Sequence, residues 1–105
     1  MCGITGYIGK KNAEIEAVKM LRLLEYRGYD SAGVVTLCNN NFNLKRSVGN
    51  ISNLEKKVFE DVSTCAISHT RWATHGKPSE RNAHPHLGEK GKWAIVHNEI
   101  GRAHV

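Results

Sequence analysis

The chain has 105 residues, of which 40% are hydrophobic and 24% charged, and its 15 Lys and Arg against 10 Asp and Glu give a formal net charge of +5. No apolar stretch approaches the roughly 20 residues that span a bilayer, and no signal-peptide pattern opens the chain, so we expect a cytoplasmic protein with no membrane contact. The basic residues are scattered among acidic ones, which argues against nucleic acid as a partner. Three widely spaced cysteines (Cys2, Cys38, Cys65) form neither a CxxC pair nor a disulfide framework, so at least one thiol is free.

The first 30 residues predict a strand followed by a helix. Residues 2–9 alternate apolar and small side chains, as in a short strand. Asn12 is the expected N-cap of a helix that runs to about Tyr26, because apolar residues recur at helical spacing. Gly28 then ends the helix, and a loop follows.

A hairpin and a second helix are expected next. Residues 33–38 and 42–48 are strand-like and flank a polar turn, which predicts a β-hairpin. Ser52 is the expected N-cap of a short helix through about Phe59, with Glu55 in its first turn. The side chains expected to face the core are Leu54, Val58 and Phe59.

The second half contains a long segment without apolar periodicity. Residues 64–70 alternate like a strand and lead into a loop over 71–86, and loops of this length are usually functional. Residues 91–98 return to strand character and end in Asn98, which either donates a hydrogen bond to a developing oxyanion or simply begins a turn. Interleaved strands, helices and a hairpin predict an α+β fold with a mostly antiparallel sheet.

Cys2 is the first candidate for chemistry. Removal of Met1 before such a small residue makes Cys2 N-terminal. Its α-amine, with a reference pKa near ~8, then lies within reach of its thiol, so base and nucleophile share one residue. This is the arrangement of N-terminal nucleophile amidases, and the alternative is an ordinary small residue after Met.

A second group of candidates lies in HTRWATHG, residues 69–76. Arg71 offers a planar fork of donors suited to a carboxylate, Thr70 and Thr74 offer hydroxyls, and Trp72 offers a flat cover. These features predict a carboxylate-binding loop, whereas the alternative is a surface loop with Trp72 packed on the core.

The histidines suggest a metal site as a rival interpretation. His75, His84 and His86 lie within twelve residues of one another, and the last two are possible zinc ligands on a strand. Their spacing matches no zinc motif, no cysteine is near, and Pro85 restrains the directions of its neighbours, so we expect no metal.

Four segments occur together in a specific order: MCGITGYIG, LLEYRGYDSAG, SHTRWATHGKPSERNAHPH and VHN. In this order they resemble the glutaminase domain of the glutamine–fructose-6-phosphate aminotransferase family, a class II amidotransferase domain with an N-terminal nucleophile. The match covers residues 1–98. The resemblance implies the four-layer αββα sandwich of N-terminal nucleophile (Ntn) hydrolases, here incomplete. An amidophosphoribosyltransferase-like class II enzyme is the alternative within this class, and a non-enzymatic binding module is the alternative outside it.

The resemblance assigns the reacting groups. Cys2 corresponds to the nucleophile that attacks the glutamine side-chain amide, and Asn98 to the oxyanion-hole side chain. Arg27 falls in the segment that packs near the nucleophile. Glu99 stands where the family has a Gly that donates its backbone N–H to the oxyanion hole, and a negative charge is unfavourable beside an oxyanion.

The resemblance also assigns the partners. Arg71 matches the residue that holds the α-carboxylate of L-glutamine, with Thr74 and His75 beside it and Trp72 in the loop that covers it. No cofactor is implied. Ammonia goes to fructose 6-phosphate, which is bound by a C-terminal region that is not in this chain, and the full-length protein is expected to be a homo-oligomer. We therefore expect the isolated chain to show little or no glutaminase turnover.

Residues 99–105, EIGRAHV, match nothing expected of the family. A nucleotide sequence that encodes them also contains a common short-read sequencing adapter. We therefore expect residues 1–98 to be the N-terminal part of a class II glutamine amidotransferase domain, and 99–105 to be a non-native tail.

Overall fold

The structure is a computed structural model that describes residues 3–10, 12–25, 30–38, 40–59, 62–71, 83–88 and 94–96. Two helices and six strands lie within these residues. In chain order they are β1 (Gly3–Ile8), α1 (Ala13–Arg22), β2 (Ser31–Cys38), β3 (Asn41–Val48), α2 (Ile51–Glu55), β4 (Cys65–Arg71), β5 (His86–Leu87) and β6 (Ala94–Ile95). Neither described helix is long and apolar enough to cross a membrane.

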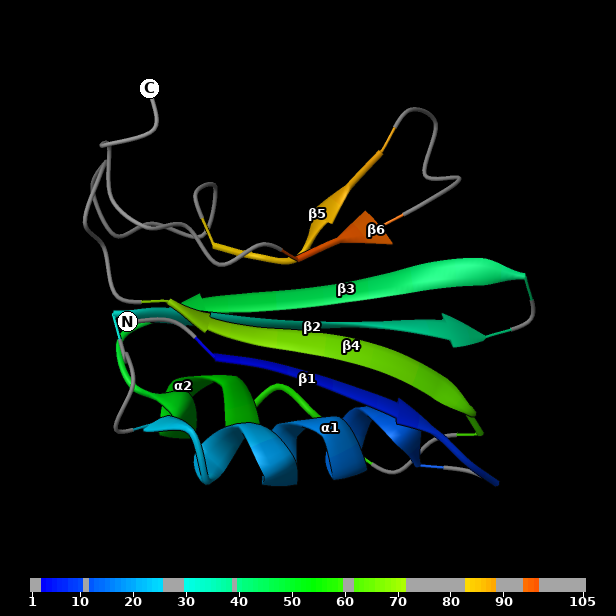
Figure 1. Cartoon of the computed structure of the whole chain (residues 1–105), viewed down its shortest axis with the longest axis horizontal. Helices are drawn as coiled ribbons and strands as arrows, with labels where there is room; N and C mark the ends of the chain where they lie inside the picture. The colour runs from blue at the N-terminus through cyan, green and yellow to red at the C-terminus, as the bar shows by residue number, and fades with distance from the viewer. Residues whose placement is uncertain are drawn as a thin grey trace.

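The elements are arranged in three layers. Four strands form an antiparallel sheet in the order β1-β4-β2-β3, and β5 pairs with β6 in a second antiparallel sheet. Figure 1 shows α1 and α2 on one face of the four-stranded sheet and the second sheet over the opposite face. This order of helix, sheet and sheet corresponds to three of the four layers of an αββα sandwich. The predicted α+β class, the hairpin and the antiparallel pairing are confirmed.

The main core lies between the helices and the four-stranded sheet. Helix α1 buries one stripe of side chains at helical spacing, and two of these are alanines, which allow the helix to lie close to the sheet. The strands contribute residues from the sheet face opposite β5. The buried core comprises Ala13, Ala17, Val18, Leu21, Ala32, Val34, Ile51, Leu54 and Ala66.

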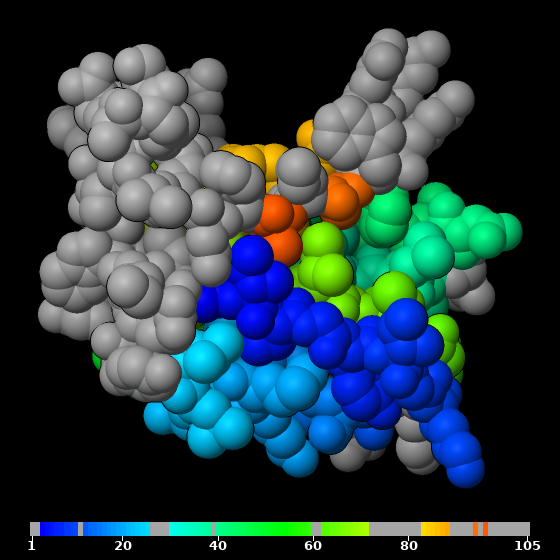
Figure 2. Space-filling model, in the orientation of Figure 1, coloured from blue at the N-terminus to red at the C-terminus, as the bar shows by residue number. Residues whose placement is uncertain are grey.

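The second sheet packs on the other face of the four-stranded sheet. In the space-filling view the atoms of β5 and β6 lie directly against those of the first sheet (Figure 2). An apolar cavity of about 120 Å³ remains between the two sheets, lined by Ala94 of β6 and by side chains that include Val35, Leu37 and Ile67.

The predicted N-cap residue of α1 is confirmed, whereas that of α2 is wrong. Asn12 does occupy the N-cap position of α1, but its φ is 59° and its side chain makes no capping hydrogen bond. Asn50, not Ser52, caps α2, since the Asn50 side chain accepts a hydrogen bond from the Ser52 N–H at 3.1 Å. Helix α1 ends at Arg22, four residues before the predicted end.

Three further predictions were wrong in detail. Phe59 is 64% exposed and does not face the core; the Lys45 ammonium lies 3.9 Å from the centre of its ring. Glu55 ends α2 instead of beginning it, and its carboxylate accepts a hydrogen bond from Arg22 Nε at 2.9 Å. The segment predicted as a loop over 71–86 contains the start of β5, because His86 pairs with Ile95.

Candidate active site

The start of β1 and the end of β4 lie side by side, at the same end of the first sheet. In the antiparallel pair Gly3 lies opposite Thr70. Gly3 directly follows Cys2 in the sequence, and Thr70 directly precedes Arg71. The register therefore brings the residue after the predicted nucleophile beside the residue before the predicted carboxylate ligand.

Position 3 has little room for a side chain. A Cβ added to Gly3 would lie 3.0 Å from two side-chain atoms of Leu24 and 3.3 Å from the methyl group of Thr70. The absence of a side chain thus allows the start of β1 to lie close to both its partner strand and the chain after α1.

A buried pair of hydroxyl groups fixes the register of β1. Thr5 Oγ1 donates to the Ala17 carbonyl at 3.1 Å and is also hydrogen-bonded to the hydroxyl of Ser68 on β4. Both side chains are buried, so a one-residue slip of β1 would remove these bonds and turn Thr5 to the opposite face of the sheet.

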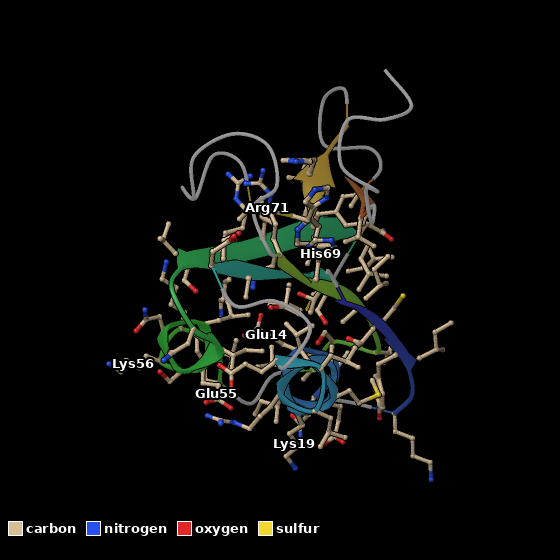
Figure 3. All side chains as sticks on the ribbon, turned by 60° about the vertical axis from the view of Figure 1, so that its left-hand side comes forward. Glu14, Lys19, Glu55, Lys56, His69 and Arg71 are labelled. Carbon is tan, nitrogen blue, oxygen red and sulfur yellow. The ribbon has the colours of Figure 1, made fainter. Side chains whose placement is uncertain are left out.

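The structure describes Thr70 and Arg71 of the predicted carboxylate-binding loop, and Thr70 is buried. Arg71 is the predicted carboxylate ligand. It is half-buried, and its backbone carbonyl accepts a hydrogen bond from the Asp30 N–H at 2.9 Å. Ser31 of β2 lies opposite Arg71 in the β2–β4 register. Figure 3 shows the side chains of Arg71 and His69 on the β5 side of the sheet, whereas Glu14 lies on the helix side.

A row of histidines connects the two sheets. His69 is fully buried, and its ring stacks on that of His84 with 4.2 Å between centroids and 29° between planes. The rings of His84 and His86 are 4.5 Å apart and tilted by 52°. Burial, and then the charges of Arg46 and Arg71, lower the pKa of His86 below its ordinary value.

The rival zinc interpretation involves two described histidines, His84 and His86. In the part of the chain that the structure describes, no group of three or more His, Cys, Asp or Glu side chains is arranged to hold a metal ion. His75, the third member of that interpretation, lies outside the described residues.

The chain before β5 is held against the first sheet at Gly33. A Cβ at Gly33 would lie 2.0 Å from the His84 carbonyl oxygen and 2.9 Å from Pro85 Cδ. Arg46, opposite Gly33 on β3, donates from Nη1 to the Ala83 carbonyl at 3.4 Å. Neither residue was predicted from the sequence, although a glycine inside a strand is a known sign of close backbone approach.

The other predicted site residues lie outside the described residues. They are Cys2, Arg27, Trp72, Thr74, His75 and Asn98. Their roles stay predictions, supported by their proximity in sequence to described elements: Cys2 precedes β1, and Trp72 follows β4.

Comparison with solved structures defines the class of fold. No protein-family model matches the chain. A structure of glutamine phosphoribosylpyrophosphate amidotransferase from B. subtilis, complexed with ADP and GMP, superimposes with a TM-score of 0.69 at 21% sequence identity, over 86% of this chain and 20% of that one. The chain therefore has the Ntn fold of class II amidotransferases, here incomplete.

Curated relatives identify the family. Glutamine–fructose-6-phosphate aminotransferases (isomerizing) from Caldanaerobacter subterraneus and Streptococcus agalactiae are each 52% identical to the chain, and that of Mycobacterium tuberculosis is 47% identical. The resemblance inferred from the motifs is confirmed: the chain corresponds to the N-terminal part of the glutamine–fructose-6-phosphate aminotransferase family. Each alignment covers 95% of this chain and 17% of the relative, so the chain spans about a sixth of the length of these relatives.

Proposed function

We propose that this chain carries the nucleophile and the carboxylate-binding residue of a glutaminase that hydrolyses the side-chain amide of L-glutamine. The observation that carries the proposal is the β1–β4 register, in which Gly3 lies opposite Thr70. Because Cys2 and Arg71 are the adjacent residues in sequence, a glutamine held at Arg71 has its amide in the neighbourhood of a thiol.

The proposed chemistry needs no cofactor. Once Met1 is removed, the α-amine of Cys2 accepts the thiol proton, and the sulfur attacks the amide carbon of L-glutamine. Ammonia leaves with the proton, and a γ-glutamyl thioester forms. Water then hydrolyses the thioester, which releases glutamate and regenerates the thiol. Asn98 is the proposed donor to the oxyanion of both tetrahedral intermediates, and Arg27 packs near the nucleophile.

The proposed binding residues suit an amino acid. The Arg71 guanidinium holds the α-carboxylate through two parallel N–H donors, which a lysine cannot reproduce. Thr74 and His75 add polar contacts to the same substrate, and Trp72 covers it.

In the whole protein, we propose that the ammonia is transferred to fructose 6-phosphate in the cytoplasm by a homo-oligomer. Residues 1–98 are the proposed native part of the domain and 99–105 a non-native tail, which sequencing of the genomic locus tests.

The proposal is tested by binding, since we expect little turnover from the chain alone. L-glutamine is titrated into the chain and into the variants Arg71→Lys and Arg22→Lys, and affinity is measured by calorimetry. Arg22 is the control, because it lies on α1 and pairs with Glu55 on the helix side of the sheet. We expect Arg71→Lys to weaken binding at least about tenfold, as expected when a bidentate charged contact is lost, and Arg22→Lys to leave binding unchanged. Equal affinities for all three proteins, or no binding to any of them, would contradict the proposal.

A further inference from the structure

A buried hydroxyl group lies opposite Arg71 in the four-stranded sheet. Ser31, the first residue of β2, has no exposed surface, and its Oγ has no hydrogen-bond partner among the described residues. Buried hydroxyls in native proteins nearly always have a partner, so an unpaired one needs an explanation.

Ser31 lies on the same face of the sheet as Arg71. A Cβ at Gly33 would point at the His84 carbonyl on the β5 side, and Ser31 precedes Gly33 by two residues, so its side chain points to that side as well. Arg71 follows His69 by two residues on β4, and His69 stacks on a ring of the β5 segment. Directly opposite residues on one face have Cβ atoms about 4.5–5.5 Å apart.

A second guanidinium lies diagonally from Ser31 on the other neighbouring strand, where Val48 is the residue directly opposite Ser31. Arg46 of β3 lies opposite Gly33, and its Nη1 reaches the Ala83 carbonyl on the β5 side. Arg46 and Arg71 therefore lie on the same face of the sheet, on the two strands that adjoin β2. The Ser31 hydroxyl thus lies on the central strand, between two strands that each carry an arginine.

The chemistry of these groups points to an anion. Guanidinium groups only donate hydrogen bonds, so neither arginine can accept the proton of the Ser31 hydroxyl. A carboxylate has two oxygens with four acceptor positions, which is enough for both a guanidinium and a hydroxyl. We propose that Ser31 is a further substrate-binding residue, whose hydroxyl donates to the α-carboxylate that Arg71 holds. This inference rests on the proposed function.

The chain offers a matched control for Ser31. Ser47 on β3 is also a buried serine whose Oγ has no partner among the described residues, but it adjoins Arg46 in the strand and therefore points to the helix side. Ser31→Ala and Ser47→Ala make the same chemical change at similar burial, on opposite faces of the same sheet. Neither removes a hydrogen bond that the described residues make, so neither variant should unfold at a lower temperature than the unsubstituted chain.

The experiment is a titration of the full chain and its variants with L-glutamine, followed by NMR chemical shifts, with thermal unfolding measured in parallel. We expect Ser31→Ala to weaken L-glutamine binding about tenfold, as for loss of a hydrogen bond to a charged group, with no loss of thermal stability. Ser47→Ala should bind as the unsubstituted chain does. A purely structural role for Ser31 would lower the unfolding temperature and leave the affinity of the folded protein unchanged.

Other outcomes separate this inference from the proposed function. If Arg71→Lys weakens L-glutamine binding and Ser31→Ala does not, the role of Ser31 is wrong and the proposed function stands. If Ser31→Ala weakens binding of inorganic phosphate but not of L-glutamine, the anion is not a carboxylate and the inference is wrong. If the unsubstituted chain does not bind L-glutamine, both are overturned.

Discussion

Substitution of Gly33 by alanine should detach the second sheet from the first. Gly33 is the third residue of β2, and the added Cβ would lie 2.0 Å from the His84 carbonyl oxygen and 2.9 Å from both Arg46 Cγ and Pro85 Cδ. Cβ atoms essentially never come closer than 3.0 Å to a heavy atom outside their own residue and its two chain neighbours. The His84 carbonyl is backbone, so the whole segment before β5 must move by at least about 1 Å to make room.

The expected loss of stability follows from two opposing effects. Overpacking of this kind typically costs about 1–3 kcal/mol. Alanine is otherwise more favourable than glycine inside a strand by roughly 0.5–1 kcal/mol. We therefore expect Gly33→Ala to lower the free energy of unfolding by about 1–2 kcal/mol, which for a chain of this size lowers the Tm by roughly 4–10 °C.

Gly6→Ala is the matched control. Gly6 is an interior residue of β1 in the same sheet, and the nearest heavy atom to a Cβ there is the Ala66 carbonyl oxygen at 4.0 Å. Since nothing has to move, only the favourable effect of alanine remains, and we expect this variant to be as stable as the unsubstituted chain or up to about 1 kcal/mol more stable.

Thermal unfolding and amide hydrogen exchange together test this reasoning. In Gly33→Ala, amides of residues 83–88 should exchange faster, whereas those of β1 to β4 should stay protected. If Gly33→Ala and Gly6→Ala unfold at the same temperature and exchange alike, the close approach of the β5 segment to β2 is wrong.

Three other measurements follow from the structure. Lys45→Met should lower the free energy of unfolding, measured in urea, by about 3 kcal/mol. The reason is that the fully buried Glu14 carboxylate loses the ammonium that contacts it at 2.6 Å. An effect below about 1 kcal/mol would contradict a buried ion pair. The pKa of His86 is lowered by burial and by two arginines, so the folded protein favours the neutral ring. The contribution of His86 to the free energy of unfolding should therefore be complete above pH 6.5 and decline as the pH falls below it. His86→Gln should weaken this dependence in unfolding measured from pH 5 to 8. Asn50→Ala should cost about 1 kcal/mol, measured by thermal unfolding, as expected for the residue that caps α2, and a neutral result would show that another residue is the cap.

Patterns among residues close in sequence predicted the helix α1 and the β2–β3 hairpin. The apolar periodicity of α1 and the two alternating runs around a polar turn led to the correct helix and hairpin. Asn50 and Ser52 are both good N-cap residues, and only the backbone path after Gly49, with its φ of 95°, determines which one caps α2.

Contacts between distant segments could not be predicted in the same way. Strand β5 consists of two residues that pair with β6, and nothing in the composition of the segment around them is typical of a strand. Likewise, Gly33 resembles any strand glycine until the segment at His84 packs on it. The candidate site follows the same rule. The suitability of the Arg71 guanidinium for a carboxylate was evident from its residue type, but its proximity to Gly3 and Ser31 depends on strand register.

The central claim is that Cys2 is a nucleophile directed at glutamine, and selective alkylation tests it most directly. A diazoketone analogue of L-glutamine takes up a proton at its diazo carbon, and a thiolate then displaces N2 from that carbon to form a thioether. The chain contains its own controls, because Cys38 and Cys65 are free and half-buried. After reaction and proteolysis, mass spectrometry should find the adduct on Cys2 alone, and excess L-glutamine should prevent it. Equal labelling of all three cysteines, or labelling of Cys2 that L-glutamine does not slow, would contradict the account.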